Sequence, residues 1–169
     1  MDRSTLIDEG LRAFVQRESA KLGQVGREST RTRSSISQTP RQLGLILVDA
    51  SVWTDHLRSA DAQLADLLER QQVAMHPLVM GEIACGSLKK RASIFELLTE
   101  LPMAVVAEAD EVLGFIERHG LYGKGIGYVD AHLIASAALT EDAKLWTRDK
   151  RLLAVAQKMG YAFQDSSMH

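Results

Sequence analysis

Apolar residues are distributed differently in the two parts of the chain. Before residue 43, the one clear pattern is a set of apolar side chains spaced as on one face of a helix: Ile7, Leu11, Phe14 and Val15. The stretch "GQVGRESTRTRSSISQTPRQ" that follows is rich in Ser, Arg, Gly and Thr, a composition typical of a linker. We therefore predict that residues 1–42 form an amphipathic helix followed by a flexible linker.

From Leu43 onward, short apolar runs alternate with segments of helical periodicity. Strands separated by helices are typical of βαβ units, in which helices cover both faces of a parallel sheet. The predicted fold class is α/β, an α/β/α sandwich with a central, mainly parallel sheet, formed by residues 43–169. The predicted strands are 45–48, 73–75, 103–106, 144–146 and 161–163, and the predicted helices are 61–70, 78–88, 93–101, 110–119, 128–139 and 150–159.

Composition narrows the class of protein. The formal charge is −2, but residues 1–42 carry 8 basic and 5 acidic side chains, which leaves 12 basic and 17 acidic side chains for the rest. A domain with an excess of acids does not attract nucleic acid through its overall charge, although a cation-binding acidic site would contribute to that excess. A single cysteine, no apolar leader and no long apolar run predict a cytoplasmic protein that does not span a membrane.

Two acids are predicted to lie at the carboxyl ends of strands. Asp49 directly follows the apolar run "LILV", and Asp149 follows "KLWT". In open α/β sheets, ligands bind at this edge of the sheet. Two further acids, Asp130 and Glu82, share a helix face with apolar neighbours at a spacing of three and four residues. We predict that these four acids point inward, and that Mg²⁺ or Mn²⁺ relieves their mutual repulsion.

Each acid also has a purely structural interpretation. Asp49 and Asp149 each precede a predicted helix and would serve as its N-cap, while Asp130 would favour the dipole of its own helix. Glu82 taken alone would be a half-exposed helix residue. Only the four acids in combination favour a functional site.

Four ordered motifs make this part of the chain resemble a PIN domain, specifically a VapC-type toxin ribonuclease. The motifs are "ILVDASVWTDHLR", "HPLVMGEIACG", "GIGYVDAHLIASA" and "LWTRDKRL", and the resemblance covers about Leu45 to Phe163. It implies that Asp49, Glu82, Asp130 and Asp149 are the catalytic, metal-binding acids. The residues at the family's hydroxyl positions are Ser51 and Thr147, and Ala50 stands where the family commonly has Thr.

The resemblance implies a divalent-metal-dependent endoribonuclease, the toxin of a type II toxin–antitoxin system. Its cofactor would be Mg²⁺ or Mn²⁺, its substrate single-stranded or loop RNA, and its partners a second copy of the chain and a cognate antitoxin. A metal-dependent phosphatase is one alternative, although a haloacid-dehalogenase-like enzyme would need a second Asp at position 51, which is Ser. The other alternative is a catalytically silent PIN-like interaction module.

The N-terminal segment does not fit the usual toxin, which begins a few residues before its first strand. "LIDEGLRAFVQRESAK", residues 6–21, resembles the C-terminal helix of a VapB-type antitoxin, and an ordinary amphipathic helix is the alternative. Either residues 1–42 are a fused antitoxin remnant, or the true start of the protein lies nearer Leu43. In the first case, the helix would dock on the nuclease domain and reduce its activity.

Overall fold

The structure is a computed structural model that describes residues 44–165. The predicted helix and linker of residues 1–42 lie outside the described residues. Within the described range, three parallel strands form a sheet of order β2-β1-β3, made by β1 (Ile46–Val48), β2 (Val73–Ala74) and β3 (Lys144–Trp146). The predicted α/β class with a parallel central sheet is confirmed.

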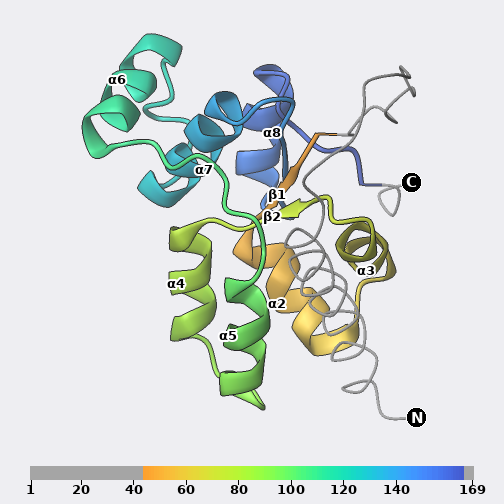
Figure 1. The fold of residues 1–169 in the computed structure, drawn as a ribbon. Coiled ribbons are helices and arrows are strands. Elements are labelled where there is room, and N and C mark those ends of the chain that lie inside the picture. The colour runs from red at the N-terminus through yellow and green to blue at the C-terminus, as the bar shows by residue number, and fades with distance from the viewer. Residues whose placement is uncertain (1–43, 166–169) are drawn as a thin grey trace, which may run out of the picture.

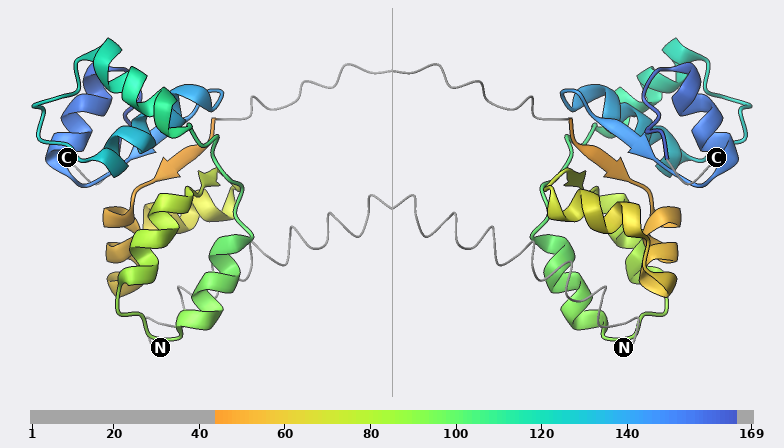
Figure 2. Two further views of the ribbon diagram at one scale, coloured as in Figure 1. Left: turned by 90° about the vertical axis from the view of Figure 1, so that its left-hand side faces the viewer. Right: turned by 90° about the vertical axis from the view of Figure 1, so that its right-hand side faces the viewer.

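Helices cover the sheet on both sides. In Figure 1, α2 (Ala50–Ser59), α4 (Pro77–Cys85) and α5 (Arg91–Thr99) lie together below the strands. Above the strands lie α6 (Ala109–His119), α7 (Tyr128–Leu139) and α8 (Lys150–Lys158), and the side views of Figure 2 show the same division. The remaining helix, α3 (Ala62–Glu69), leads from α2 to β2.

The central strand β1 forms because its side chains are buried on both faces of the sheet. All three residues of β1 are buried, and Leu47 and Val48 are fully so. They pack in one core with Trp53 of α2, Leu133 of α7 and Trp146 of β3. A central strand covered from both sides needs apolar residues at consecutive positions, and this is the pattern that the sequence shows there.

Two of the predicted strands are reduced to single bridges. Met103 pairs in parallel with Met75, and Ala162 with Leu145, so each outer strand contributes one pair instead of the three or four residues predicted. Beyond Ala104 the chain leaves the sheet, and the Val105 N–H donates to the Thr140 hydroxyl at 3.0 Å. Val105 and Val106 are consequently about half exposed, which apolar periodicity alone did not indicate.

Helix boundaries follow local capping. Asp61 accepts a hydrogen bond from the Leu64 N–H at 2.9 Å and so begins α3, and Gly120, with a φ of 57°, ends α6. The predicted helix 78–88 is shorter than expected, because α4 ends at Cys85 and an irregular loop leads to α5. Within residues 44–165, no helix is long and apolar enough to cross a membrane.

Candidate active site

The register of the sheet brings the first and last predicted motifs together. Val48 pairs with Trp146, and the Asp49 N–H donates to the Trp146 carbonyl at 2.9 Å. Asp49 and Thr147 are therefore neighbours one residue beyond the strands, although 98 positions separate them in the sequence. The carboxyl edge of the sheet is where the sequence predicted a site.

Asp49 is buried and held by a set of hydrogen bonds. Its Oδ1 accepts the Ala50 N–H at 2.8 Å, and its Oδ2 accepts the hydroxyls of Ser51 at 2.5 Å and Thr147 at 2.8 Å. A buried carboxylate needs such donors, because the charge has lost its water. The two hydroxyl positions implied by the family resemblance thus both contact Asp49, and Asp49 also caps α2 as the structural interpretation required.

Asp149 and Asp130 each combine a capping role with an unused oxygen. Asp149 Oδ1 accepts the N–H groups of Arg151 and Leu152 at 2.8 and 2.9 Å at the start of α8. Asp130 Oδ2 accepts the Gly127 N–H at 2.7 Å and closes the first turn of α7. Within residues 44–165, the second oxygen of each side chain has no hydrogen-bond donor, so it is available to a ligand.

Glu82 lies at the open side of the site. The prediction that all four acids point inward is wrong, because Glu82 and Asp149 are exposed, Asp130 is half-buried, and only Asp49 is buried. Burial of four charges would carry a large desolvation cost, and an open edge avoids it. The other three carboxylates therefore lie toward the protein surface, while Asp49 is buried.

Electrostatic coupling shows that the four acids share one neighbourhood. Although Glu82 is exposed as a residue, partial desolvation of its carboxyl raises its pKa, and the charges of Asp49 and Asp130 raise it further. Burial also raises the pKa of Asp130, and the Gly127 N–H works against this shift. Asp49 and Asp149 then add their repulsion to Asp130. A cation placed among these groups would relieve the repulsion.

The donor chemistry fits a hard divalent cation, although the side chains are not drawn tightly together. Carboxylate oxygens are the ligands that Mg²⁺ and Mn²⁺ prefer, and these acids come from four separate elements of the fold. Among residues 44–165, no three His, Cys, Asp or Glu side chains converge closely enough to coordinate one ion. The four acids are nevertheless near enough for the charges of Asp49, Asp130 and Asp149 to raise the pKa values of their neighbours Glu82 and Asp130.

Sequence reasoning missed the residue that fixes the Thr147–Asp149 loop. No sequence motif assigned a role to Arg148, but its guanidinium forms ion pairs with Asp55 of α2 and Asp61 before α3. The Arg148 N–H also donates to the Ser51 hydroxyl at 3.1 Å. No local sequence pattern indicates these contacts, because Arg148 lies 93 and 87 positions from Asp55 and Asp61.

A buried histidine joins the two helices that carry Glu82 and Asp130. His76 caps α4, with Nδ1 accepting the Leu78 N–H at 3.1 Å, and its Nε2 lies 3.1 Å from the Ser136 hydroxyl of α7. Burial lowers the His76 pKa to about 4, and His132 adds a smaller effect in the same direction. His76 is therefore neutral at pH 7, and it links α4 to α7 beneath the acidic edge.

Fold and site together define a small α/β protein with an acidic centre at the carboxyl edge of a parallel sheet. Comparison with known proteins gives the family. Residues 46–158 match the sequence profile of the PIN domain. Ribonuclease VapC32 of Mycobacterium tuberculosis, from strains CDC 1551 / Oshkosh and ATCC 25618 / H37Rv, is 48% identical over 121 residues, 72% of this chain and 98% of that protein.

The chain belongs to the PIN domain family and is a VapC-type member of it. The resemblance inferred from the four motifs is thereby confirmed. A crystal structure of PAE2754 from Pyrobaculum aerophilum superimposes with a TM-score of 0.46 and 20% identity, covering 74% of this chain and 88% of that one.

Proposed function

We propose that the protein is a divalent-metal-dependent endoribonuclease that acts as the toxin of a toxin–antitoxin pair. The observation that carries this proposal is the coupling of Glu82, Asp130, Asp49 and Asp149 through their charges at one edge of the sheet. Support also comes from Ribonuclease VapC32, whose whole length is nearly covered by the similarity. Members of the PIN nuclease family typically depend on metal ions.

The four acids are proposed to hold Mg²⁺ or Mn²⁺. Such an ion supplies positive charge to a phosphodiester in the transition state and lowers the pKa of water. Asp49, kept in one orientation by Ser51 and Thr147, would contribute a fixed charge. Glu82, Asp130 and Asp149 would approach from helices on three sides, with carboxylate oxygens that no donor of residues 44–165 occupies.

The RNA backbone is proposed to be held by a basic side chain beside these acids. The Arg151 N–H donates to Asp149, while the Arg151 guanidinium donates to the Gly125 carbonyl at 3.5 Å. Arg151 therefore lies between the acidic edge and the loop before α7 that contains Gly123, Gly125 and Gly127. A guanidinium in that position is suited to a backbone phosphate. Sequence preference is not set by such contacts, because phosphates carry no base information.

The remaining parts of the proposal follow from family membership. A VapC-type protein implies a cognate antitoxin, a homodimer and a cytoplasmic site of action, where its RNA substrate is found. A phosphatase of the haloacid-dehalogenase type has less support, because position 51 is a serine whose hydroxyl donates to Asp49. A silent interaction module would not need four coupled carboxylates at the sheet edge.

The test is incubation of the purified full chain with a mixed RNA pool in Mg²⁺, in Mn²⁺ and in chelator. We expect discrete cleavage products with either metal and none with chelator. Cleavage that persists in chelator would refute the metal mechanism. A complete lack of cleavage under all three conditions, for a folded protein freed of antitoxin, would refute the nuclease.

A further inference from the structure

The loop between α6 and α7 presents aromatic and basic side chains beside the acidic edge. Residues 120–127, called here the glycine loop, are anchored by two apolar side chains. Leu121 is buried, and Ile126 packs against the main core. Between these anchors, Tyr122 and Lys124 are both exposed. The fold therefore holds the backbone of this loop in place while its aromatic and basic side chains stay in solvent.

The glycine loop contacts α8 at one of its glycines. Gly125 has a φ of 75°, and a Cβ atom at this position would lie 3.0 Å from Cδ of Arg151. Glycine is required here both for the backbone conformation and for the close approach of the Arg151 side chain. Because the Arg151 N–H donates to Asp149, this contact places the loop beside one of the proposed metal-binding acids.

Tyr128 directly follows the glycine loop and continues the same surface toward α4. Its ring stands perpendicular to that of His132, with the centroids 4.6 Å apart and the planes at 88°. The His132 ring in turn lies 6.3 Å from the ring of His76, which caps α4. Tyr128 is nevertheless 48% exposed, so part of its held ring remains open to a ligand.

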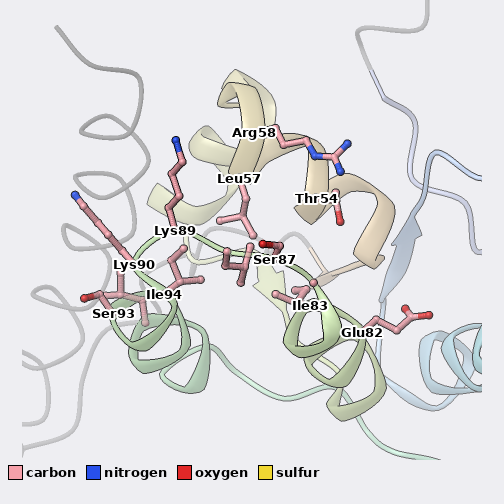
Figure 3. Close-up of a pocket in the computed structure, with 13 residues that line it drawn as sticks. Thr54, Leu57, Arg58, Glu82, Ile83, Ser87, Lys89, Lys90, Ser93 and Ile94 are labelled. Atoms are coloured by element: carbon pink, nitrogen blue, oxygen red, sulfur yellow. The ribbon is translucent and has the colours of Figure 1, made fainter.

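Two further acids lie next to this surface. The Asp130 carboxylate accepts the Gly127 N–H of the glycine loop at 2.7 Å, and Asp130 is two residues from Tyr128. On the α4 side, Figure 3 shows Glu82 extending away from the apolar residues Leu57 and Ile94, toward the blue C-terminal part of the chain. The glycine loop and Tyr128 therefore border the acidic edge from α8 toward α4.

The chemistry of this border is that of a site for single-stranded nucleic acid. Tyr122 is 67% exposed, and neither Lys124 nor Arg151 forms an ion pair with an acid of residues 44–165. Aromatic rings bind unpaired bases by stacking, and basic side chains bind the phosphates between them. Because acids outnumber basic residues after residue 42, RNA would have to be held by local contacts of this kind.

We propose that Tyr122 and Tyr128 form a stacking site for unpaired nucleobases, and that Lys124 and Arg151 hold neighbouring phosphates. Such a site takes single strands and loops and discriminates against duplex, in which each base is already stacked between its neighbours. That it positions the nucleotides beside the bond to be cut rests on the proposed nuclease function. The stacking itself does not, since binding is measurable without cleavage.

The test is the fluorescence anisotropy of a labelled, unstructured RNA strand, titrated with the full chain in chelator at low salt. The proposed metal-dependent cleavage does not occur under these conditions. Tyr122→Leu and Tyr128→Leu should each weaken binding roughly five- to a hundredfold, whereas Tyr128→Phe, which keeps the ring, should bind like the wild type. Leu139→Ala removes an exposed apolar side chain at the opposite end of α7 and should have no effect.

A strand without bases separates stacking from phosphate contacts. An abasic RNA strand of the same length should bind the wild type and Tyr122→Leu equally, because it offers nothing to stack. Lys124→Ala should instead weaken the binding of both strands by the same factor, roughly two- to fivefold, and reduce its salt dependence. Lys158→Ala is the matched control, since Lys158 is an exposed lysine at the far end of α8 from Arg151.

Three results would overturn the inference. The first is a wild type that does not bind the strand, or binding that neither leucine substitution weakens. Tyr122→Leu changes an exposed loop residue, so this comparison holds even if Tyr128→Leu fails to fold. The second is equally tight binding of a duplex of the same sequence. The third is an altered oligomeric state of either leucine variant in light scattering, because the rings would then contact a second copy of the chain.

The fate of the stacking site and that of the nuclease proposal are distinguishable. In Mg²⁺ or Mn²⁺, cleavage at low RNA concentration should fall in the leucine variants by the same factors as binding. If binding depends on the tyrosines but no RNA is cut, the stacking site stands and the nuclease proposal fails. If the wild type cuts RNA and both leucine variants cut it equally fast, the nuclease stands and the stacking site fails.

Discussion

The two halves of the acidic site differ in how firmly the fold holds them. Asp49 is 7% exposed and receives hydrogen bonds from two backbone N–H groups and two hydroxyls. Glu82 is exposed, and its pKa is raised by desolvation and by the negative charges around it. One carboxylate is stabilised by donors within the fold, and the other lies in an environment that disfavours its charge.

This difference explains how the proposed site tolerates the repulsion between its own carboxylates. The fold fixes one charge and leaves the others at the surface, where water lowers the cost of keeping them apart. Groups of the second kind are the ones that a cation would stabilise most.

Asp49→Asn should reduce RNA cleavage by orders of magnitude, about a thousandfold or more. The amide has nearly the same shape but lacks the charge, and its NH₂ group must face one of the donors that now contact the carboxylate. We also expect a loss of about 1–3 kcal/mol in unfolding free energy. Cleavage assays and urea melts measure both effects, with Asp66→Asn on α3 as the control. Normal cleavage by Asp49→Asn would remove Asp49 from the site.

Arg148→Ala should loosen the surroundings of Asp49, the carboxylate that the fold holds firmly. RNA cleavage should fall by roughly ten- to a hundredfold, because a small displacement of catalytic groups has effects of that size. The substitution leaves Asp55 and Asp61 without their partner and frees the loop that carries Thr147 and Asp149. Arg70→Ala is the matched control, since its ion pair with Asp66 has side chains 60% and 51% exposed and contributes little. Equal effects of the two substitutions on kcat would contradict a positioning role for Arg148.

Acidification should destabilise the fold through His76, which joins α4, the helix of Glu82, to α7, the helix of Asp130. His76 has a pKa of about 4 in the fold against an ordinary value of 6.5, so the unfolded chain binds more protons between these values. The contribution of neutral His76 to the unfolding free energy is therefore fully present above pH 6.5. It is lost as the pH drops toward 4, by about 2 kcal/mol between pH 7 and pH 5. Urea melts at both pH values measure this loss. His76→Asn, which retains a capping acceptor, should show a smaller loss.

Asp130→Asn should melt no lower than the wild type in chelator, because removal of one charge reduces the repulsion at the site. The amide oxygen can still accept the Gly127 N–H, so the start of α7 is preserved. Added Mn²⁺ should raise the melting temperature of the wild type with concentration and that of the variant much less. Thermal melts across a Mn²⁺ titration measure this. An equal shift in both proteins would mean that Asp130 is only a helix cap.

Removal of residues 1–42 should have the smallest effect. A chain that begins at Leu43 retains both halves of the site, so we expect it to fold with an unchanged melting temperature and to cut RNA as fast as the full chain or a few-fold faster. Circular dichroism and initial cleavage rates measure these. Aggregation, or a loss of activity, would show that the domain boundary at residue 43 is misplaced.

The sequence predicts those parts of the fold that local patterns determine. Buried runs such as Ile46–Val48 and the periodic helix Tyr128–Leu139 were predicted within a residue of their observed bounds. The outer strands were overestimated, since Met103–Val106 depends on contacts with Thr140 that no local pattern records. The exposure of Glu82 was missed for a related reason: a shared helix face does not reveal where that face meets solvent.

The candidate site follows the same rule. Asp49 and Asp149 were predicted at one sheet edge, because strand ends in a parallel sheet share an edge. The ion pairs of Arg148 and the bridge from His76 to Ser136 join residues 60 to 93 positions apart. Contacts of that range arise only once the sheet order is known, and the sequence pattern does not give that order.

The pairing of β1 with β3 has a consequence for the synthesis of the protein. Asp49 obtains the Thr147 hydroxyl only after the ribosome has added another 98 residues, which takes roughly 5 to 20 s at ordinary elongation rates. During that interval, the nascent chain contains Asp49 and Glu82 but neither Thr147 nor Asp149. The proposed site would thus stay incomplete until translation is almost finished, and a copy that terminates before Asp149 would lack it.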